Sequence, residues 1–189
     1  SLLFERTGMS QDKDALIQSL RKQSRQLLPA DIVRDPYILE FTELPAGKEI
    51  HETDLESALI THLQQFLLEL GKGFCFLGRQ YRMQIDNELY YADLVFYHRY
   101  LRCMVIIELK TRGFRHEDSS QLNMYLNYFK EQETEPDENP PIGILLCTDK
   151  KENVVKYATA GMENLFVSRY KTALPTKEEL QAFIEAEKR

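Results

Sequence analysis

The stretch Tyr90–Lys110, YYADLVFYHRYLRCMVIIELK, constrains the fold of this chain more than any other segment. Two apolar runs rich in β-branched and aromatic residues flank a short basic turn, a pattern that predicts two adjacent strands. Each run carries an acid where a buried strand would favour valine or isoleucine: Asp93 in the first and Glu108 in the second. Lys110 follows two places later. Because a buried charge is costly without a partner, these three residues need a chemical explanation.

The two runs predict a β-hairpin that brings the two acids together. With a four-residue turn at Arg99–Arg102, the numbers of paired residues sum to 201, so Asp93 lies directly opposite Glu108. Their Cβ atoms would then be about 5 Å apart. Because side chains alternate along a strand, Glu108 and Lys110 share one face. A slip of one residue would move Asp93 to the other face, so the prediction depends on the register.

Two carboxylates at this distance repel each other unless a cation lies between them or one of them stays protonated. A divalent metal resolves the conflict, and oxygen-only ligands favour Mg²⁺ or Mn²⁺ over zinc. Such a metal polarises a phosphate oxygen and lowers the pKa of a water, while Lys110 could orient or deprotonate that water or stabilise developing charge. These parts suit phosphodiester hydrolysis. The alternative is a buried ion pair in which Lys110 neutralises one acid.

The charge distribution favours a polyanionic partner at this part of the chain. The whole chain carries a net charge of −6, which alone argues weakly against nucleic acid. Between Lys72 and His116, however, eight basic residues face only four acidic ones. A basic centre around two acids, inside an acidic protein, is typical of a localised site for a polyanion. Chance clustering of surface charge is the alternative.

The pattern along the chain predicts an α/β domain on a mixed central sheet. The run PIGILLCT is continuously apolar, as in a strand buried on both faces. A boundary between residues 50 and 51 would separate a small N-terminal helical arm, 1–50, from the main domain, 51–189. The expected helices are 10–28, 53–70, 117–130, 151–160 and one that begins at Thr176; the expected strands are 74–85, 89–98, 103–110, 141–148 and 165–170.

Several classes of protein are disfavoured by composition. No apolar run approaches the roughly 18 residues of a membrane span, and no signal-peptide pattern opens the chain. The three cysteines are widely spaced within apolar runs, which predicts buried, reduced thiols and a cytoplasmic protein rather than disulfides or a thiolate metal site. The opening, SLLFERTGMS, lacks an initiator methionine, so we expect a fragment of a longer protein, or a tag-derived Ser1.

The ordered motifs resemble a known group of nucleases. Asp93, followed by Glu108-Leu109-Lys110, resembles the D…(E/D)-x-K signature of the PD-(D/E)XK superfamily. The segment QLNMY, at 121–125, is similar to the Q-x-x-x-Y element of the RecB and lambda-exonuclease-like branch. A longer part of the sequence resembles the C-terminal nuclease domain of YhcG-like bacterial proteins. It runs from GRQYRMQIDNELYYADL to DENPPIGILLC, and the segments LLFERTGMS and RDPYILEF are also similar. The resemblance covers nearly the whole chain.

This resemblance implies a restriction-endonuclease-like core, α-β-β-β-α-β, and a set of metal ligands. Asp93 and Glu108 would bind Mg²⁺ or Mn²⁺, with the backbone carbonyl of Leu109 as a third ligand. Lys110 would be the catalytic lysine. Glu56, on the first core helix, matches the extra acid that many members add to the metal shell; alternatively it is an exposed helix acid.

The resemblance also implies roles in substrate contact. Gln121 would position the substrate or a water, and Tyr125 would approach the DNA backbone; a plain helix amide and a core aromatic are the alternatives. Arg79 and Gln80 could reach phosphate or be ordinary polar residues of a strand face. Arg112 stands where the family more often has another pair after the lysine, and it could add a phosphate contact.

The leading hypothesis is therefore a Mg²⁺-dependent nuclease, with DNA as the expected partner and no membrane association. The alternative, from another functional class, is a non-catalytic nucleic-acid-binding or assembly module that keeps the nuclease fold. The intact acid, acid and lysine set favours the enzyme. A homodimer, or a requirement for a missing N-terminal domain, is compatible with both hypotheses.

Overall fold

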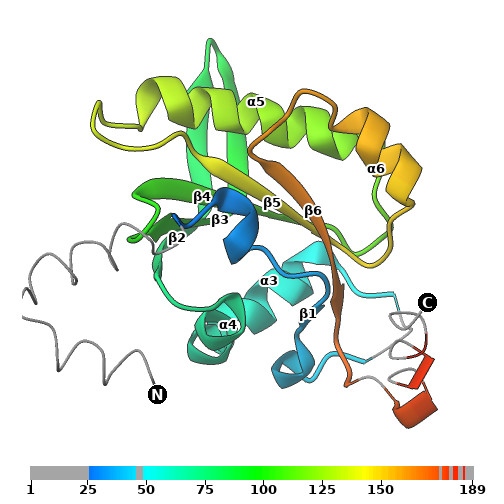
Figure 1. Ribbon diagram of the computed structural model, residues 1–189. Coiled ribbons are helices and arrows are strands. Elements are labelled where there is room, and N and C mark those ends of the chain that lie inside the picture. Colours follow the sequence, from blue (N-terminus) through cyan, green and yellow to red (C-terminus); the bar gives the residue numbers. More distant parts are fainter. Residues whose placement is uncertain (1–25, 46–48, 175, 179–180, 183–184, 186–189) are drawn as a thin grey trace, which may run out of the picture.

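A six-stranded mixed sheet forms the centre of the computed structural model, which describes residues 26–45, 49–174, 176–178, 181–182 and 185 (Figure 1). The strand order is β1-β6-β5-β4-β3-β2. Strands β1, β6, β5 and β4 are parallel to one another, whereas β3 is antiparallel to both of its neighbours, β4 and β2. The strands are β1 (Tyr37–Ile38), β2 (Phe74–Ile85), β3 (Glu88–His98), β4 (Cys103–Leu109), β5 (Ile142–Cys147) and β6 (Leu165–Lys171).

Helices cover the two faces of this sheet (Figure 1). One face carries α5 (His116–Gln132) and α6 (Glu152–Ala158). The other carries α3 (Glu52–Thr61), α4 (Leu63–Leu70) and two short 3₁₀ helices, Pro29–Ile32 and Glu40–Thr42. Both faces of β4 and β5 are therefore buried, which explains why these strands read as continuous apolar runs.

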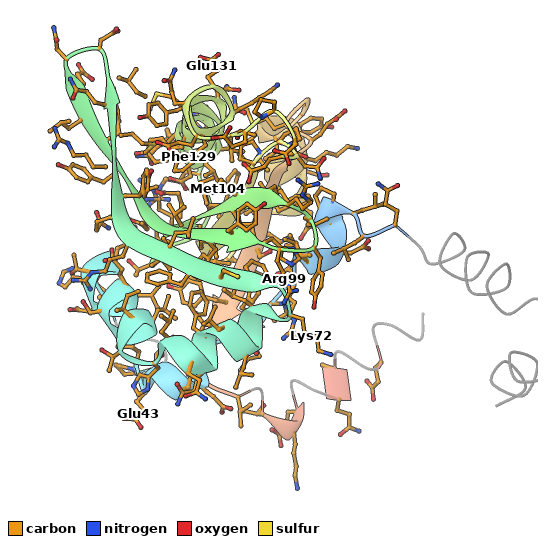
Figure 2. The ribbon with its side chains drawn as sticks, turned by 90° about the vertical axis from the view of Figure 1, so that its left-hand side faces the viewer. Glu43, Lys72, Arg99, Met104, Phe129 and Glu131 are labelled. Carbon is orange, nitrogen blue, oxygen red and sulfur yellow. The ribbon has the colours of Figure 1, made fainter. Side chains whose placement is uncertain are left out.

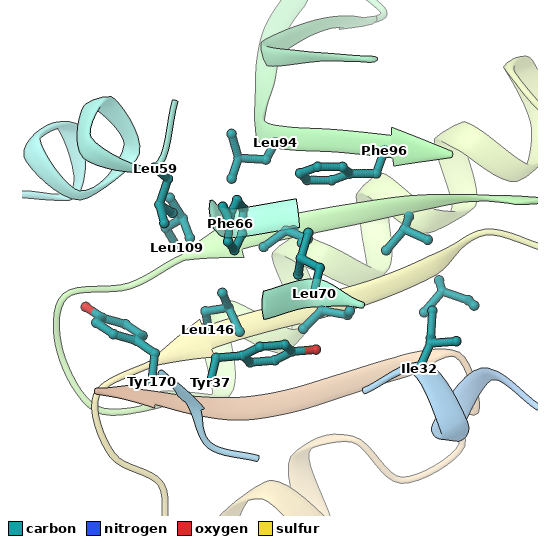
Figure 3. Close-up of a cluster of buried hydrophobic side chains, with 14 of the residues drawn as sticks. Ile32, Tyr37, Leu59, Phe66, Leu70, Leu94, Phe96, Leu109, Leu146 and Tyr170 are labelled. Atoms are coloured by element: carbon teal, nitrogen blue, oxygen red, sulfur yellow. The ribbon is translucent and has the colours of Figure 1, made fainter. Parts of the chain in front are cut away.

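Each face of the sheet has its own hydrophobic core. Beneath α3 and α4, Leu59, Phe66 and Phe96 are fully buried and pack with Tyr37 of β1 (Figure 3). Beneath α5, the cluster includes Ile106 of β4 and Phe129. The close approach of α5 requires a glycine at 143, because a Cβ there would lie 2.9 Å from the Leu122 side chain, which is also part of this cluster.

The predicted fold class and the predicted hairpin register are confirmed. In the structure, Leu94 pairs with Ile107 and His98 with Cys103, so the paired numbers sum to 201 along the whole β3–β4 ladder. The four residues 99–102 form the turn between the two strands, as predicted. The five predicted strands begin and end within one residue of their predicted ranges, whereas β1 was not predicted.

Other predictions differ from the structure in detail. The single helix expected over 53–70 is divided into α3 and α4 at His62, whose backbone is not helical (φ −109°, ψ 39°). Cys75 is exposed, contrary to expectation, because it faces outward from β2, which is at the edge of the sheet; Cys103 and Cys147 are buried and free, as predicted. The helix predicted over 10–28 falls almost entirely outside the described residues, as does most of the helix predicted from Thr176.

The N-terminal region contributes to the main sheet where it is described. Strand β1 pairs with β6, and Tyr37 and Leu39 are fully buried in the core. Asp35 accepts hydrogen bonds from the backbone N–H and the side-chain Nε of Arg169 and pairs with Lys150 at 2.7 Å, which attaches this region to β6 and to the end of β5. The division between residues 50 and 51 stays a prediction.

None of the helices among the described residues has the length and apolarity needed to cross a membrane.

A buried histidine ties together two turns at one end of the sheet. His98 is fully buried; its Nδ1 accepts a hydrogen bond from the Leu101 N–H (3.2 Å), and its Nε2 lies 3.1 Å from the Lys72 carbonyl. These two bonds select the neutral tautomer with the proton on Nε2. Gly73 leaves room for the ring, because a Cβ at this left-handed position (φ +99°) would lie 2.8 Å from His98.

Burial lowers the pKa of His98 below 6.5, so the folded state binds this proton less readily than the unfolded state. Its contribution to stability is therefore complete above about pH 6.5 and is lost as the pH falls through the lowered value. We expect the free energy of unfolding to fall more steeply between about pH 7 and pH 5 in the parent than in His98→Gln, which does not titrate. Urea unfolding at both pH values measures this difference, and equal slopes would contradict it.

Candidate active site

The two predicted acids meet where β3 and β4 separate. Beyond the Leu94–Ile107 pair, backbone-to-backbone pairing gives way to side chains: the Asp93 N–H donates to Glu108 Oε1 (3.0 Å), and the Leu109 N–H donates to Asp93 Oδ2 (2.8 Å). Each carboxylate thus accepts a backbone hydrogen bond from the other strand. This reciprocal pair fixes both side chains side by side in the wedge between the strands.

The backbone of Leu109 also faces this wedge. The Lys110 N–H, one residue later, donates to Leu146 of β5 (2.8 Å), so the two successive peptides point to opposite sides of β4. Since the N–H and C=O of one strand residue point to the same side, the Leu109 carbonyl is directed towards Asp93. This orientation is the one that the predicted third ligand requires.

Gln80 connects Asp93 to helix α3. Its side-chain amide donates to Asp93 Oδ1 (3.1 Å) and also to Glu56 Oε2. The Gln80 backbone is in the left-handed region (φ +47°), which is uncommon for a residue with a side chain and is found more often at functional sites. Arg79 lies beside it, with its Nε 3.8 Å from Glu56 Oε1. Glu56 therefore contacts the acids of the sheet through the Gln80 amide.

Helix α3 contributes a second acid that the sequence interpretation missed. Glu52 lies one helical turn before Glu56, and its Oε2 is 3.6 Å from the Lys110 ammonium. The Lys110 side chain is 13% exposed, so this ion pair holds it near the wedge rather than in bulk solvent. The spacing of two glutamates on one helix face is a signal that could have identified Glu52.

Helix α5 places the predicted Gln121 and Tyr125 together. They lie one turn apart, and the Gln121 side-chain amide donates to the Tyr125 hydroxyl (2.9 Å). The Tyr125 ring is buried, as the core alternative expected, and burial together with the nearby Glu108 and Asp93 charges raises the pKa of Tyr125. Gln121 is exposed at the helix surface. Contact of Tyr125 with the DNA backbone stays a prediction.

The Arg112 guanidinium forms an ion pair with Asp118, an acid that the sequence interpretation also missed. The guanidinium donates two parallel hydrogen bonds of 2.8 Å to Asp118, which is buried. Asp118 also accepts the Arg115 N–H at the start of α5, the position of the acid in a capping box. These bonds lower the pKa of Asp118 against the opposing effect of burial. A phosphate contact by Arg112 would use the part of the guanidinium that Asp118 leaves accessible, and it stays a prediction.

The two central acids are held in a costly electrostatic state. Burial, together with repulsion from Asp93, raises the pKa of Glu108 to about 8. Burial also raises the pKa of Asp93, although its hydrogen bond from Leu109 and the nearby Lys110 charge act in the opposite direction. A cation between the two carboxylates would relieve both desolvation and repulsion.

The donor set fits a hard divalent cation. Two carboxylates and a carbonyl offer only oxygen, which suits Mg²⁺ or Mn²⁺. Within the described ranges, no group of three or more His, Cys, Asp or Glu side chains is arranged to hold a metal. The candidate centre therefore consists of the Asp93 and Glu108 pair with the Leu109 carbonyl, and Glu56 lies behind the Gln80 amide.

Comparison with solved structures gives matches of low similarity. A repair endonuclease from Pyrococcus abyssi matches with a TM-score of 0.46 and 21% identity over 67% of this chain and 50% of that chain. A structure of an EndoMS–dsDNA complex matches with a TM-score of 0.44 and 17% identity over 70% of this chain and 51% of that chain.

Comparison of sequences is much more specific. A protein of Escherichia coli (strain K12) named "Putative nuclease YhcG" is 48% identical over 178 residues, which is 94% of this chain and 47% of that protein. The chain thus spans about half the length of this relative. The profile of the YhcG PDDEXK nuclease domain family matches residues 30–185. Because this match covers most of the chain and includes every candidate site residue, the chain belongs to the YhcG family of PDDEXK nuclease domains.

Proposed function

We propose that this domain is a divalent-metal-dependent nuclease that hydrolyses phosphodiester bonds in DNA. The observation that carries the proposal is the reciprocal pair of hydrogen bonds between Asp93 and Glu108 and the backbone of the opposite strand. The bonds hold two repelling carboxylates side by side. Burial and mutual repulsion make it costly to ionise both carboxyl groups, and a bound cation would offset this cost.

Each residue of the site has a part in this proposal. Asp93, Glu108 and the Leu109 carbonyl would hold Mg²⁺ or Mn²⁺. When bound, the cation supplies Lewis acidity towards a phosphate oxygen and lowers the pKa of a water. Lys110, held near the wedge by Glu52, orients or deprotonates the attacking water or stabilises the charge that develops.

Residues around the centre position the substrate. Gln121, whose side-chain amide donates to the Tyr125 hydroxyl, would position the substrate or a water. Arg79 is exposed beside Glu56 and is available to phosphate. The proposal includes a cytoplasmic location, in keeping with the two buried free thiols of Cys103 and Cys147.

Substitution of the central residues is expected to abolish cleavage. Asp93→Asn keeps the shape of the side chain but removes a ligand charge, so metal-dependent cutting should become undetectable. Lys110→Ala should slow cutting by about 10²–10⁴-fold, the usual contribution of a positioned acid or base. The assay follows cleavage of circular and linear DNA with Mg²⁺ or Mn²⁺, and cutting of the circle identifies endonuclease action.

Lys130→Ala is the matched control, because Lys130 is an exposed lysine in the last turn of α5. It should cut as the parent does. Equal activity in the parent, Asp93→Asn and Lys110→Ala would identify a contaminant. A metal-loaded parent that binds DNA without cutting it would favour the non-catalytic module.

The raised pKa of Glu108 makes the metal-free protein less stable as the pH rises. The folded state binds this proton up to about pH 8, whereas a free glutamate releases it near pH 4.5. The stability contribution is therefore present below about pH 4.5 and is lost as the pH rises towards 8. In EDTA, from about pH 5.5 to pH 7.5, the parent should lose about 1 kcal/mol per pH unit relative to Glu108→Gln.

Metal binding gives a readout that does not depend on activity. At about pH 8, Mn²⁺ should raise the melting temperature of the parent, since it binds only the folded site. The same concentration should have little effect on Asp93→Asn or Glu108→Gln. An equal shift in all three proteins would place the metal elsewhere, against the proposal.

A further inference from the structure

The β2–β3 hairpin extends well past the rest of the sheet. Strand β4 pairs with β3 only from Leu94 to His98, whereas the β2–β3 ladder continues from Leu94 to the Ile85–Glu88 pair. The result is a two-stranded ribbon over residues 79–94, with its turn at Asp86–Asn87. It projects beyond the sheet at the level of α5 and is free of strand neighbours there (Figures 1 and 2). We call residues 79–94 the ribbon.

The two faces of the ribbon differ in chemistry. One face packs on α5: Met83 is fully buried, the Tyr81 ring lies 5.2 Å from that of Phe129, and the Tyr90 ring lies 6.3 Å from that of Tyr125. Side chains alternate along a strand, so the residues between these point away from α5. They are Arg82 and Gln84 on β2 and Leu89 and Tyr91 on β3, and all four are exposed. We call them the outer face.

The outer face consists of cross-strand pairs suited to nucleic acid. Arg82 is directly opposite Tyr91, and Gln84 is opposite Leu89. Arg82 and Tyr91 make no side-chain hydrogen bond or ion pair with any other residue in the described part of the chain. The ribbon has three acids: Glu88 accepts the Tyr90 hydroxyl on the α5 side, Asp86 is in the turn, and Asp93 belongs to the candidate centre at the base of the ribbon. The outer face therefore presents an unneutralised cation beside an exposed aromatic ring.

The outer face begins close to the candidate active site. Tyr91 lies two residues before Asp93 on β3, or about 7 Å along the strand. Gln80, which binds Asp93, lies two residues before Arg82 on β2. The seven residues from Asn87 to Asp93 span about 20 Å, or roughly half a turn of a DNA duplex. A substrate whose phosphate lies at Asp93 would extend along this face.

We infer that the outer face of the ribbon binds duplex DNA on one side of the phosphate that is cut. The inference rests on the proposed function and extends its site. A two-stranded ribbon fits the major groove, which is about 12 Å wide. Arg82 contacts a phosphate or a guanine edge, Gln84 reaches base edges, and Tyr91 packs against sugar or base. The ribbon thereby determines how the duplex lies across the acids.

The test measures binding without cleavage. A fluorescent 30-base-pair duplex is titrated in EDTA with the parent, Arg82→Ala and Tyr91→Ala, at several salt concentrations. Arg82→Ala should weaken binding by about tenfold and reduce the slope of log K against log salt by about one. Tyr91→Ala should weaken binding by roughly threefold to tenfold with an unchanged slope. Arg82→Lys should recover part of the affinity if the contact is a phosphate.

Arg99→Ala is the matched control. It removes the same charge from an exposed position at the other end of β3, about 26 Å from Tyr91 along the strand. It should bind as the parent does. Tyr157→Ala, on α6, is the control for loss of an exposed tyrosine. Melting temperatures of all variants establish that each is folded, and Arg82→Gln replaces Arg82→Ala if the latter is not.

Three results would overturn the inference. Equal losses in Arg82→Ala and Arg99→Ala would mean that only net charge matters. An effect on a single strand of the same sequence but not on the duplex would exclude groove binding. If Arg82→Ala and Tyr91→Ala both bind DNA as the parent does, the outer face does not bind DNA, and a protein partner becomes the better explanation for its exposed residues. A protein that binds through Arg82 and Tyr91 but does not cut would support this inference while contradicting the proposed function.

Discussion

Backbone hydrogen bonds in the wedge between β3 and β4 keep two carboxylates in place although they repel each other. A sheet that continued past Leu94 and Ile107 would use these N–H groups for strand pairing. Here the N–H groups of Asp93 and Leu109 bind the carboxylates instead. Because hydrogen bonds to charged groups are stronger than those between neutral groups, they offset part of the desolvation of the acids. The site therefore lies where β3 and β4 separate, beyond the Leu94–Ile107 pair.

The surrounding helices complete the site with polar contacts rather than apolar packing. Helix α3 provides Glu52 for Lys110 and Glu56 for Gln80, whereas α5 provides Gln121. Both helices are anchored on hydrophobic cores at opposite faces of the sheet, so their polar residues converge at its end. Two acids beside the centre have cationic partners, since Glu52 pairs with Lys110 and Glu56 with Arg79, and Arg79 is also exposed. These contacts support the proposed binding of a polyanion by a protein with a net charge of −6.

The ribbon follows from the same division of the sheet. Strand β4 stays paired with β5 up to Leu109, and β2 and β3 continue past the Leu94–Ile107 pair without it. One face of the ribbon is stabilised by Met83 and the tyrosines that pack on α5, so the other face can carry exposed polar groups without loss of the hairpin. The chain belongs to the YhcG PDDEXK nuclease domain family, which supports a role for the two acids of the wedge in nuclease chemistry. The ribbon adds a surface over which a long substrate could lie.

The sequence alone determined five of the six strands of the sheet, the register of the hairpin and the juxtaposition of Asp93 and Glu108. These follow from local rules: strand periodicity and a turn of fixed length leave one register that buries the apolar residues. The break in the helix at His62, the exposure of Cys75, and the roles of Glu52 and Asp118 depended on tertiary structure. An ion pair between residues 58 positions apart has no local signature, because folding alone decides which helix packs against which strand end.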